Sequence, residues 1–148
     1  MSGRVLHPTD FSKASGAAFA RALAEARQNR SELLLVHVLA PVIPLGAGGE
    51  GYISPSVYDQ MEKSARAWAQ KQMDRLLAKA KAARVRARGM LMGGVAHEQI
   101  VRTAKRQRAG VIIMGTHGRT GVARFFLGSV AARVAATAPC PVLTVRGR

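Results

Sequence analysis

The sequence predicts an α/β fold: a doubly wound, five-stranded parallel sheet with helices on both faces. Two observations predict it. Short apolar runs alternate along the chain with longer segments of helical periodicity. The run 33–39 is apolar almost without interruption, which is typical of a strand buried on both faces of a parallel sheet. The length of 148 residues, 48% of them hydrophobic, suits one domain over 1–148.

Each element is expected from its own pattern. The first strand stops at Pro8, and alanines and leucines give the first helix one apolar face. In the second helix, Met61, Ala65, Trp68 and Leu76 recur at helical spacing, with Gln72 or Met73 between them, and predict the face that docks on the sheet. The third strand is placed at a sheet edge because it carries two arginines. The expected strands are 5–7, 33–39, 85–92, 111–114 and 142–145, and the expected helices are 12–28, 57–82, 96–107 and 129–136.

One glycine pattern indicates a binding site. Gly115 and Gly118 follow the apolar segment 111–114, and Gly128 and Ser129 follow nine residues later, so the pattern is G-x2-G-x9-G-S. Glycines let a backbone approach a ligand closely, and a serine at the start of a helix offers its hydroxyl beside free N–H donors. The segment is therefore expected to hold an anionic group such as a nucleotide phosphate.

Simpler roles compete at several of these positions. Asp10 could cap the first helix, Ser129 could be an N-cap without a ligand, and His117 is either a surface residue or a phosphate contact. The other three histidines, His7, His37 and His97, are expected in strand packing or on the surface, since no metal-ligand spacing occurs. The run 46–51 matches G-x-G-x-x-G by letter, but it lies between prolines and predicts a loop.

The glycine pattern is also the nucleotide-loop motif of the universal stress proteins, and further segments of the chain resemble the same family. The segment Val5–Ser12 resembles the first strand of that family with its Asp, 33–38 resembles its second strand, and 139–145 resembles its last. The resemblance spans nearly the whole chain and implies a Rossmann-like fold of the adenine nucleotide alpha-hydrolase type, with strand order 3-2-1-4-5. Strands one and four then flank the point where strand order reverses, where such sheets bind ligands.

The resemblance also implies roles for particular residues. Asp10 would hydrogen-bond the base, Val38 would line the adenine slot, and the glycines and serine of the motif would hold ribose and phosphates. The complete expected site is Pro8, Thr9, Asp10, Val38, Met114, Gly115, His117, Gly118, Gly128, Ser129 and Val130. The implied ligand is ATP, with Mg²⁺ or Mn²⁺ carried by its phosphates.

The implied function is an ATP-binding stress-response regulator, a nucleotide-dependent switch rather than a fast enzyme. A slow ATPase or autokinase is the enzymatic alternative, but no acidic cluster is evident in the sequence. Similar proteins form homodimers through the last strand, here Val142–Val145. Two positions depart from the family pattern: Gly94-Val-Ala96 replaces Gly-x-Pro, and Gly110 stands where an Asp is common.

The charge is not explained by the resemblance. The net charge is +15, and residues 63–108 hold 13 Lys or Arg against Asp74 and Glu98 alone. This basic stretch is either a solvated exterior or a surface for a polyanion, such as nucleic acid bound through its backbone with strong salt dependence. The single cysteine, Cys140, is expected to be a buried small hydrophobe. No apolar run is long enough to span a membrane, and a cytoplasmic protein is expected.

Overall fold

The predicted fold class is confirmed by the structure, a computed structural model that describes residues 3–41, 51, 53–117 and 127–147. The strands are β1 (Arg4–Pro8), β2 (Leu33–Leu39), β3 (Ala87–Gly93), β4 (Ala109–Gly115) and β5 (Val142–Val145), and the helices are α1 (Ser15–Asn29), α2 (Pro55–Ala82), α3 (Ala96–Arg106) and α4 (Ser129–Thr137). All neighbouring strands are parallel, and their order is β3-β2-β1-β4-β5. β3 is an edge strand, as predicted, and it contains Arg88, whereas Arg86 directly precedes it.

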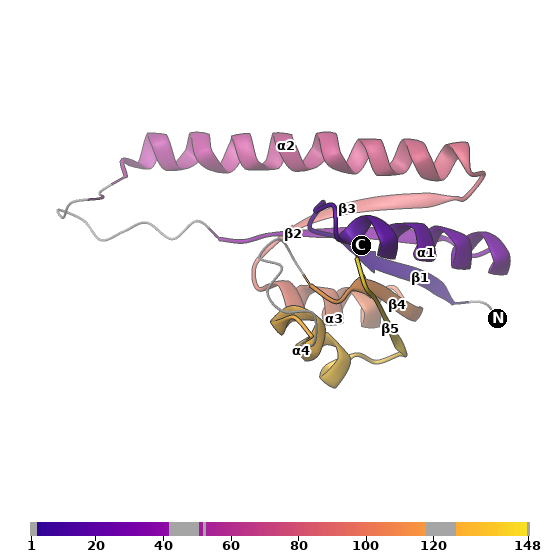
Figure 1. Cartoon of the computed structure of the whole chain (residues 1–148). Coiled ribbons are helices and arrows are strands. Elements are labelled where there is room, and N and C mark those ends of the chain that lie inside the picture. The colour runs from indigo at the N-terminus through magenta and orange to yellow at the C-terminus, as the bar shows by residue number, and fades with distance from the viewer. Residues whose placement is uncertain (1–2, 42–50, 52, 118–126, 148) are drawn as a thin grey trace.

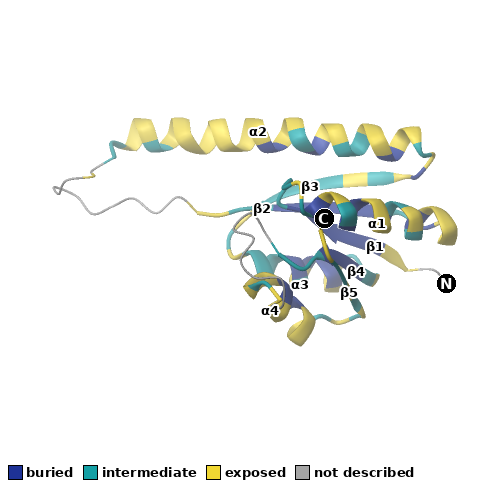
Figure 2. Ribbon diagram, in the orientation of Figure 1, coloured by how far each residue is buried: buried dark blue, intermediate teal, exposed yellow. Residues whose placement is uncertain are grey.

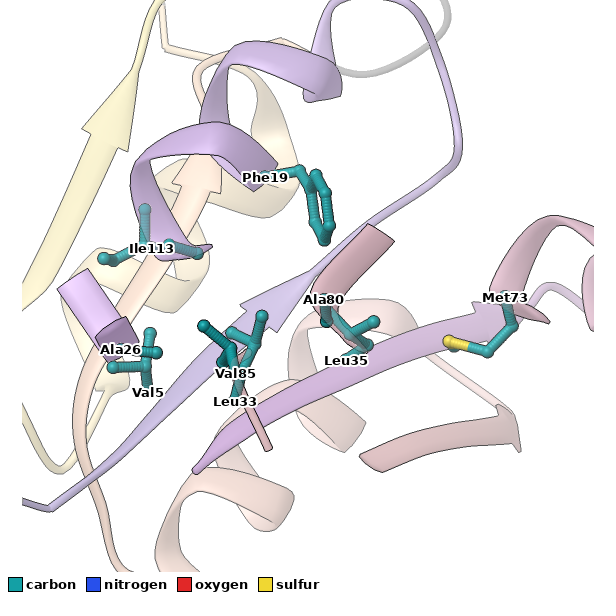
Figure 3. Packing of buried hydrophobic residues seen from close by; sticks show 10 residues of the cluster. Val5, Phe19, Ala26, Leu33, Leu35, Met73, Ala80, Val85 and Ile113 are labelled. Atoms are coloured by element: carbon teal, nitrogen blue, oxygen red, sulfur yellow. The ribbon is translucent and has the colours of Figure 1, made fainter. Parts of the chain in front are cut away.

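Two apolar layers sandwich the sheet, with α1 and α2 on one side and α3 and α4 on the other (Figure 1). β2 supplies both layers, because successive side chains of a strand point to opposite faces. Leu33 and Leu35 belong to the layer beneath α1 and α2, together with Met73 and Ile113 (Figure 3). Leu34 and Val36 belong to the other layer. The uninterrupted apolar run of β2 is therefore explained by burial on both faces.

Only the C-terminal half of α2 packs on the sheet. Its buried residues are Ala69, Met73 and Ala80, and its first half is almost wholly exposed (Figure 2). The prediction that Met61, Ala65 and Trp68 face the core is wrong, since all three are exposed, Met61 by 44% and Trp68 by 42%. The reason is length: a helix of 28 residues extends for about 42 Å, whereas the seven-residue edge strand beneath it extends for about 23 Å.

Two glycines bring the start of β1 against the start of β4. A Cβ atom on Gly3 would lie 2.6 Å from the Cα of Gly110, and one on Gly110 would lie 3.0 Å from the Cα of Gly3. The pairing of β1 with β4 shifts register directly afterwards, between Arg4 and Val5. Gly110 thus has a steric role in the contact between the two strands.

His7 is completely buried in β1. Its Nδ1 lies 2.7 Å from the carbonyl oxygen of Ile113, and because a carbonyl can only accept, Nδ1 carries the proton. Nε2 has no hydrogen-bond partner in the described part of the chain. Burial lowers the pKa of His7 to about 4, against smaller raising effects of the Ile113 carbonyl and Asp10. His7 is therefore a neutral core residue, as the prediction of strand packing allowed.

Cys140 is half-buried rather than buried. Its partial burial raises the pKa of the thiol, which leaves it less reactive than a solvent-exposed cysteine. No helix in the described ranges is both long and apolar enough to cross a membrane. The run 46–51 lies outside the described residues except for Gly51.

Candidate functional site

A cavity of about 220 Å³ opens at the carboxyl ends of β1 and β4. Strand order reverses between these two strands, so the helices that follow them leave on opposite faces of the sheet and a crevice remains. A cavity needs about 10–15 Å³ to hold one water molecule, so this cavity is large enough for a small organic ligand. Its lining residues are Pro8, Thr9, Asp10, Ser15, Val36, His37, Val38, Ala96, Ile100, Met114, Gly115, Thr116, His117, Gly128, Ser129, Val130 and Ala131.

The loop after β1 forms one wall and is held by its own side chains. The Thr9 hydroxyl accepts a hydrogen bond from the backbone N–H of Phe11 at 3.0 Å and lies 3.2 Å from the hydroxyl of Ser15. Asp10 accepts from the backbone N–H of Ser12 at 2.9 Å. This bond closes an Asx turn rather than a helix cap, because α1 begins only at Ser15. The turn fixes the carboxylate of Asp10 at the rim of the cavity.

His37, near the end of β2, is buried in strand packing as expected, and it also lines the cavity. Its Nδ1 donates to the carbonyl oxygen of Thr9 at 2.8 Å, and its ring lies 4.5 Å from that of Phe11. Phe11 in turn meets Trp68 of α2 edge-on at 5.7 Å and has a φ of 63°, which is uncommon for a bulky residue. The signal that could have indicated His37 is its place at the carboxyl end of a central strand.

The opposite wall is made by the end of β4 and the start of α4. Gly128 donates its backbone N–H to the carbonyl oxygen of Thr116 at 2.7 Å, so the two ends of the predicted loop meet. A Cβ atom on Gly128 would lie 2.9 Å from that same oxygen, which explains why this position is glycine. Gly118, which the motif also includes, lies outside the described residues.

The N-terminus of α4 points its free donors at this space. Gly128 is the N-cap, and no side chain caps the helix, so the prediction that Ser129 is the N-cap is wrong by one residue. Ser129 is the first helical residue and is exposed. The N–H groups of the first turn have no helical partners, and the turn carries no acidic residue. The helix dipole and these donors together favour an anion here.

His117 adds a second polar group to the same wall. Its Nδ1 lies 2.9 Å from the hydroxyl of Thr116, and its Nε2 is buried without a hydrogen-bond partner among the described residues. A buried polar nitrogen without a partner is costly. A ligand oxygen in the cavity would satisfy it. For the part of the chain that is described, no group of three side chains is arranged to hold a metal ion.

Fold and site together define a doubly wound α/β protein with a ligand cavity at its switch point. A family model described as "Universal stress protein family" matches residues 1–146, and the chain belongs to this family. A universal stress protein of Thermus aquaticus is 34% identical over 142 residues, which cover 96% of this chain and 97% of that protein.

Solved structures agree with this assignment. Protein MJ0577 of Methanocaldococcus jannaschii superposes with a TM-score of 0.78 at 25% identity, covering 100% of this chain and 98% of the other. A universal stress family protein of Arabidopsis thaliana, solved with AMP bound, superposes with a TM-score of 0.67 at 21% identity, covering 99% and 92%. Other universal stress proteins were solved in complex with cAMP and with dAMP.

Proposed function

We propose that this universal stress protein binds ATP in the cavity between β1 and β4 and acts as a nucleotide-dependent regulatory switch. The observation that carries the proposal is the polarity of the cavity. At the β4 wall, the N-terminus of α4 and the unpartnered Nε2 of His117 offer donors to phosphates. Toward β2, the apolar Val36 and Val38 and the carboxylate of Asp10 suit an adenine ring and its amino group.

The residues would divide the ligand between them. Asp10 would accept from the base, and the backbone at Val38 would line the adenine slot. Gly115, Gly118, Gly128 and Ser129 would hold ribose and phosphates, with Pro8, Thr9, Met114, His117 and Val130 beside them. Relatives solved with AMP, cAMP and dAMP share the adenine moiety, which supports an adenine nucleotide as the ligand class. A divalent cation, Mg²⁺ or Mn²⁺, would enter on the phosphates and water rather than on protein ligands.

A charge placed at the start of α4 tests the proposal. Ser129→Glu puts a carboxylate where the phosphates would lie, yet a negative charge at a helix N-terminus stabilises the helix. We expect this variant to remain folded and to bind ATP at least about tenfold more weakly than the native chain, because the two anions repel each other at short range. Calorimetric titration in about 0.3 M salt, where distant charges are largely screened, measures the affinity.

Two controls make the result specific. Ser129→Gln has nearly the same size without the charge and is expected to stay within a few fold of the native affinity. Adenosine, which lacks phosphates, is expected to bind the native chain and Ser129→Glu about equally. If ATP binds the Ser129→Glu variant as tightly as the native chain, the phosphates do not lie at the start of α4 and the proposal fails.

A slow ATPase or autokinase is the competing function. Among the described residues that line the cavity, Asp10 alone carries a carboxylate. Fast phosphoryl transfer needs a positioned base and bound metal ions. We therefore expect fewer turnovers than about one per minute. Faster multiple turnover that is abolished by Ser129→Glu would show that the protein is an enzyme rather than a regulatory switch.

We also propose a homodimer through β5. This strand ends the sheet, and Leu143 is 38% exposed on it. The carbonyls of Pro141 and Val145 accept hydrogen bonds from Ile112 of β4 and from Thr116 directly after it. The alternate residues Val142 and Thr144 therefore direct their backbone groups to the open edge. An open edge of this kind can pair with its copy.

Thr144→Pro removes one outward N–H from this edge and leaves the ladder to β4 in place. We expect it to convert a dimer into a monomer in sedimentation equilibrium, whereas Thr144→Val remains dimeric. A dimer that persists in the proline variant would place the interface elsewhere.

A further inference from the structure

The end of the molecule opposite the cavity gathers most of the unexplained positive charge. In a parallel sheet, every helix-to-strand turn lies at the amino ends of the strands. The turns α1–β2, α2–β3 and α3–β4 therefore share one end, on the side of the N-terminus in Figure 1. The cavity lies at the other end, beyond the carboxyl ends of β1 and β4.

Each of these three turns carries an arginine in the left-handed conformation. Arg30, Arg84 and Arg108 have φ values of 52°, 59° and 52°, and all three are exposed. Glycine or asparagine normally occupies this position after a helix, because a side chain is strained there. None of the three forms an ion pair with a carboxylate in the described part of the chain. Helix termination alone does not call for arginine at three separate turns.

Further exposed cations surround Arg30, Arg84 and Arg108. The carboxylate of Glu32 lies at this end and is shared by Arg4 at 2.8 Å and Arg88 at 3.5 Å. Arg4 and Arg88 also donate to the carbonyl and the side-chain oxygen of Gln107 at 2.9 and 3.0 Å, which holds both in place. We call this surface the basic end, made of Arg4, Arg27, Arg30, Lys79, Lys81, Arg84, Arg86, Arg88, Lys105, Arg106 and Arg108.

Helix dipoles account for part of this charge and not for the rest. The C-terminus of a helix carries about half a negative charge, which one cation in its last turn neutralises. α1 has Arg27 there, α2 has Lys79 and Lys81, and α3 has Lys105 and Arg106. The three left-handed arginines, together with Arg4, Arg86 and Arg88, come in addition, so the basic end keeps a large positive excess.

We propose that the basic end binds the phosphate backbone of double-stranded nucleic acid without reading its sequence. Arginine dominates the surface, and its planar guanidinium matches phosphate oxygens. The row from Arg84 through Arg30 to Arg108 crosses strands β3 to β4, about 14 Å at 4.8 Å per strand. A duplex carries one charge per roughly 1.7 Å of its axis, so the row can contact several phosphates.

Other polyanions fit this surface less well. Membrane-surface binding uses apolar and aromatic side chains that insert between lipids, and binding of single strands uses aromatic rings that stack on bases. The large exposed apolar residues in the described ranges lie elsewhere: Val57, Met61, Trp68, Val95, Leu127, Val130 and Leu143. The basic end therefore offers charge without apolar anchors, as backbone binding requires.

The test removes three charges without harming the fold. Arg30→Gly, Arg84→Gly and Arg108→Gly together delete the row, and glycine relieves the left-handed strain at each position. We expect this triple variant to bind a fluorescent 20-base-pair duplex about tenfold or more weakly than the native chain in anisotropy titrations at low salt. The slope of log affinity against log salt is expected to fall by about 3, one for each lost phosphate contact.

A matched variant separates a site from overall charge. Arg66→Gln, Lys71→Gln and Arg102→Gln also remove three exposed cations, but from the flanks of α2 and α3, and are expected to weaken duplex binding less than threefold. Equal weakening in both triple variants, absence of duplex binding by the native chain, or preference for vesicles containing about 30% phosphatidylserine overturns the proposal. Saturating ATP is expected to leave duplex binding unchanged, so the two sites are tested independently.

Discussion

Replacing Leu34 and Leu35 together by alanine is expected to cost about 6 kcal/mol of unfolding free energy, the sum of about 3 kcal/mol for each. Both side chains are completely buried, and each truncation leaves a cavity. The two leucines are adjacent in the chain, yet they belong to different apolar layers on opposite faces of the sheet. Their cavities do not merge, so the two costs should add to within about 0.5 kcal/mol.

Urea denaturation of the single and double variants measures this additivity. The matched pair is Leu33→Ala with Leu35→Ala, two residues on one face and in one layer, which is expected to depart from additivity by more than about 0.5 kcal/mol. Leu34→Val with Leu35→Val, at about 1 kcal/mol each, keeps the comparison measurable where the alanine double variant does not fold. Strong coupling between Leu34 and Leu35 would contradict the two-layer description.

The second large effect is a loss of stability in acid caused by His7. Its pKa is about 4 in the fold and 6.5 in the unfolded chain, so the unfolded state takes up a proton first as pH falls. The neutral ring contributes its full stability above pH 6.5, and this contribution is lost progressively down to about pH 4. The shift corresponds to about 3 kcal/mol. Protonation is unfavourable in the fold because a charged ring would be buried.

His7→Asn isolates this effect. The asparagine amide can take over the hydrogen bond to Ile113, since its nitrogen occupies nearly the position of Nδ1, but it does not titrate. We expect the free energy of unfolding of this variant, measured by denaturation between pH 7.5 and pH 4, to fall about 3 kcal/mol less than that of the native chain. His97→Asn, at a half-buried position of α3, is the control. Parallel pH profiles for His7→Asn and the native chain would disprove the assignment.

Most helices and strands could be predicted from the periodic spacing of apolar residues in the sequence. β2 was predicted at its observed bounds, because a seven-residue apolar run admits few alternatives. The strand order followed from family resemblance rather than from any pattern in the residues. The face of α2 was misjudged at Met61 and Trp68, because periodicity shows that a helix has an apolar side but not how far its neighbour extends.

The candidate site was predictable where it is made of sequence motifs and not where it is made by distant contacts. Ten of the expected site residues line one cavity, and Gly118 lies outside the described residues. His37, Ser15 and Ile100 join them only because strands and helices far apart in the sequence converge there. The N-cap of α4 was misplaced by one residue, since Gly128 and Ser129 are both common caps and only the backbone geometry decides between them.

The contact between Gly3 and Gly110 has a consequence for the evolution of the chain. The two positions are separated by most of the sequence, yet their backbones lie so close that neither accepts a Cβ atom while the other stays in place. Because the contacted atoms belong to the backbone, no substitution at the other position relieves the clash, and a side chain at either one requires a wider spacing of the two strands. Among close relatives that keep this spacing, both positions are expected to remain glycine.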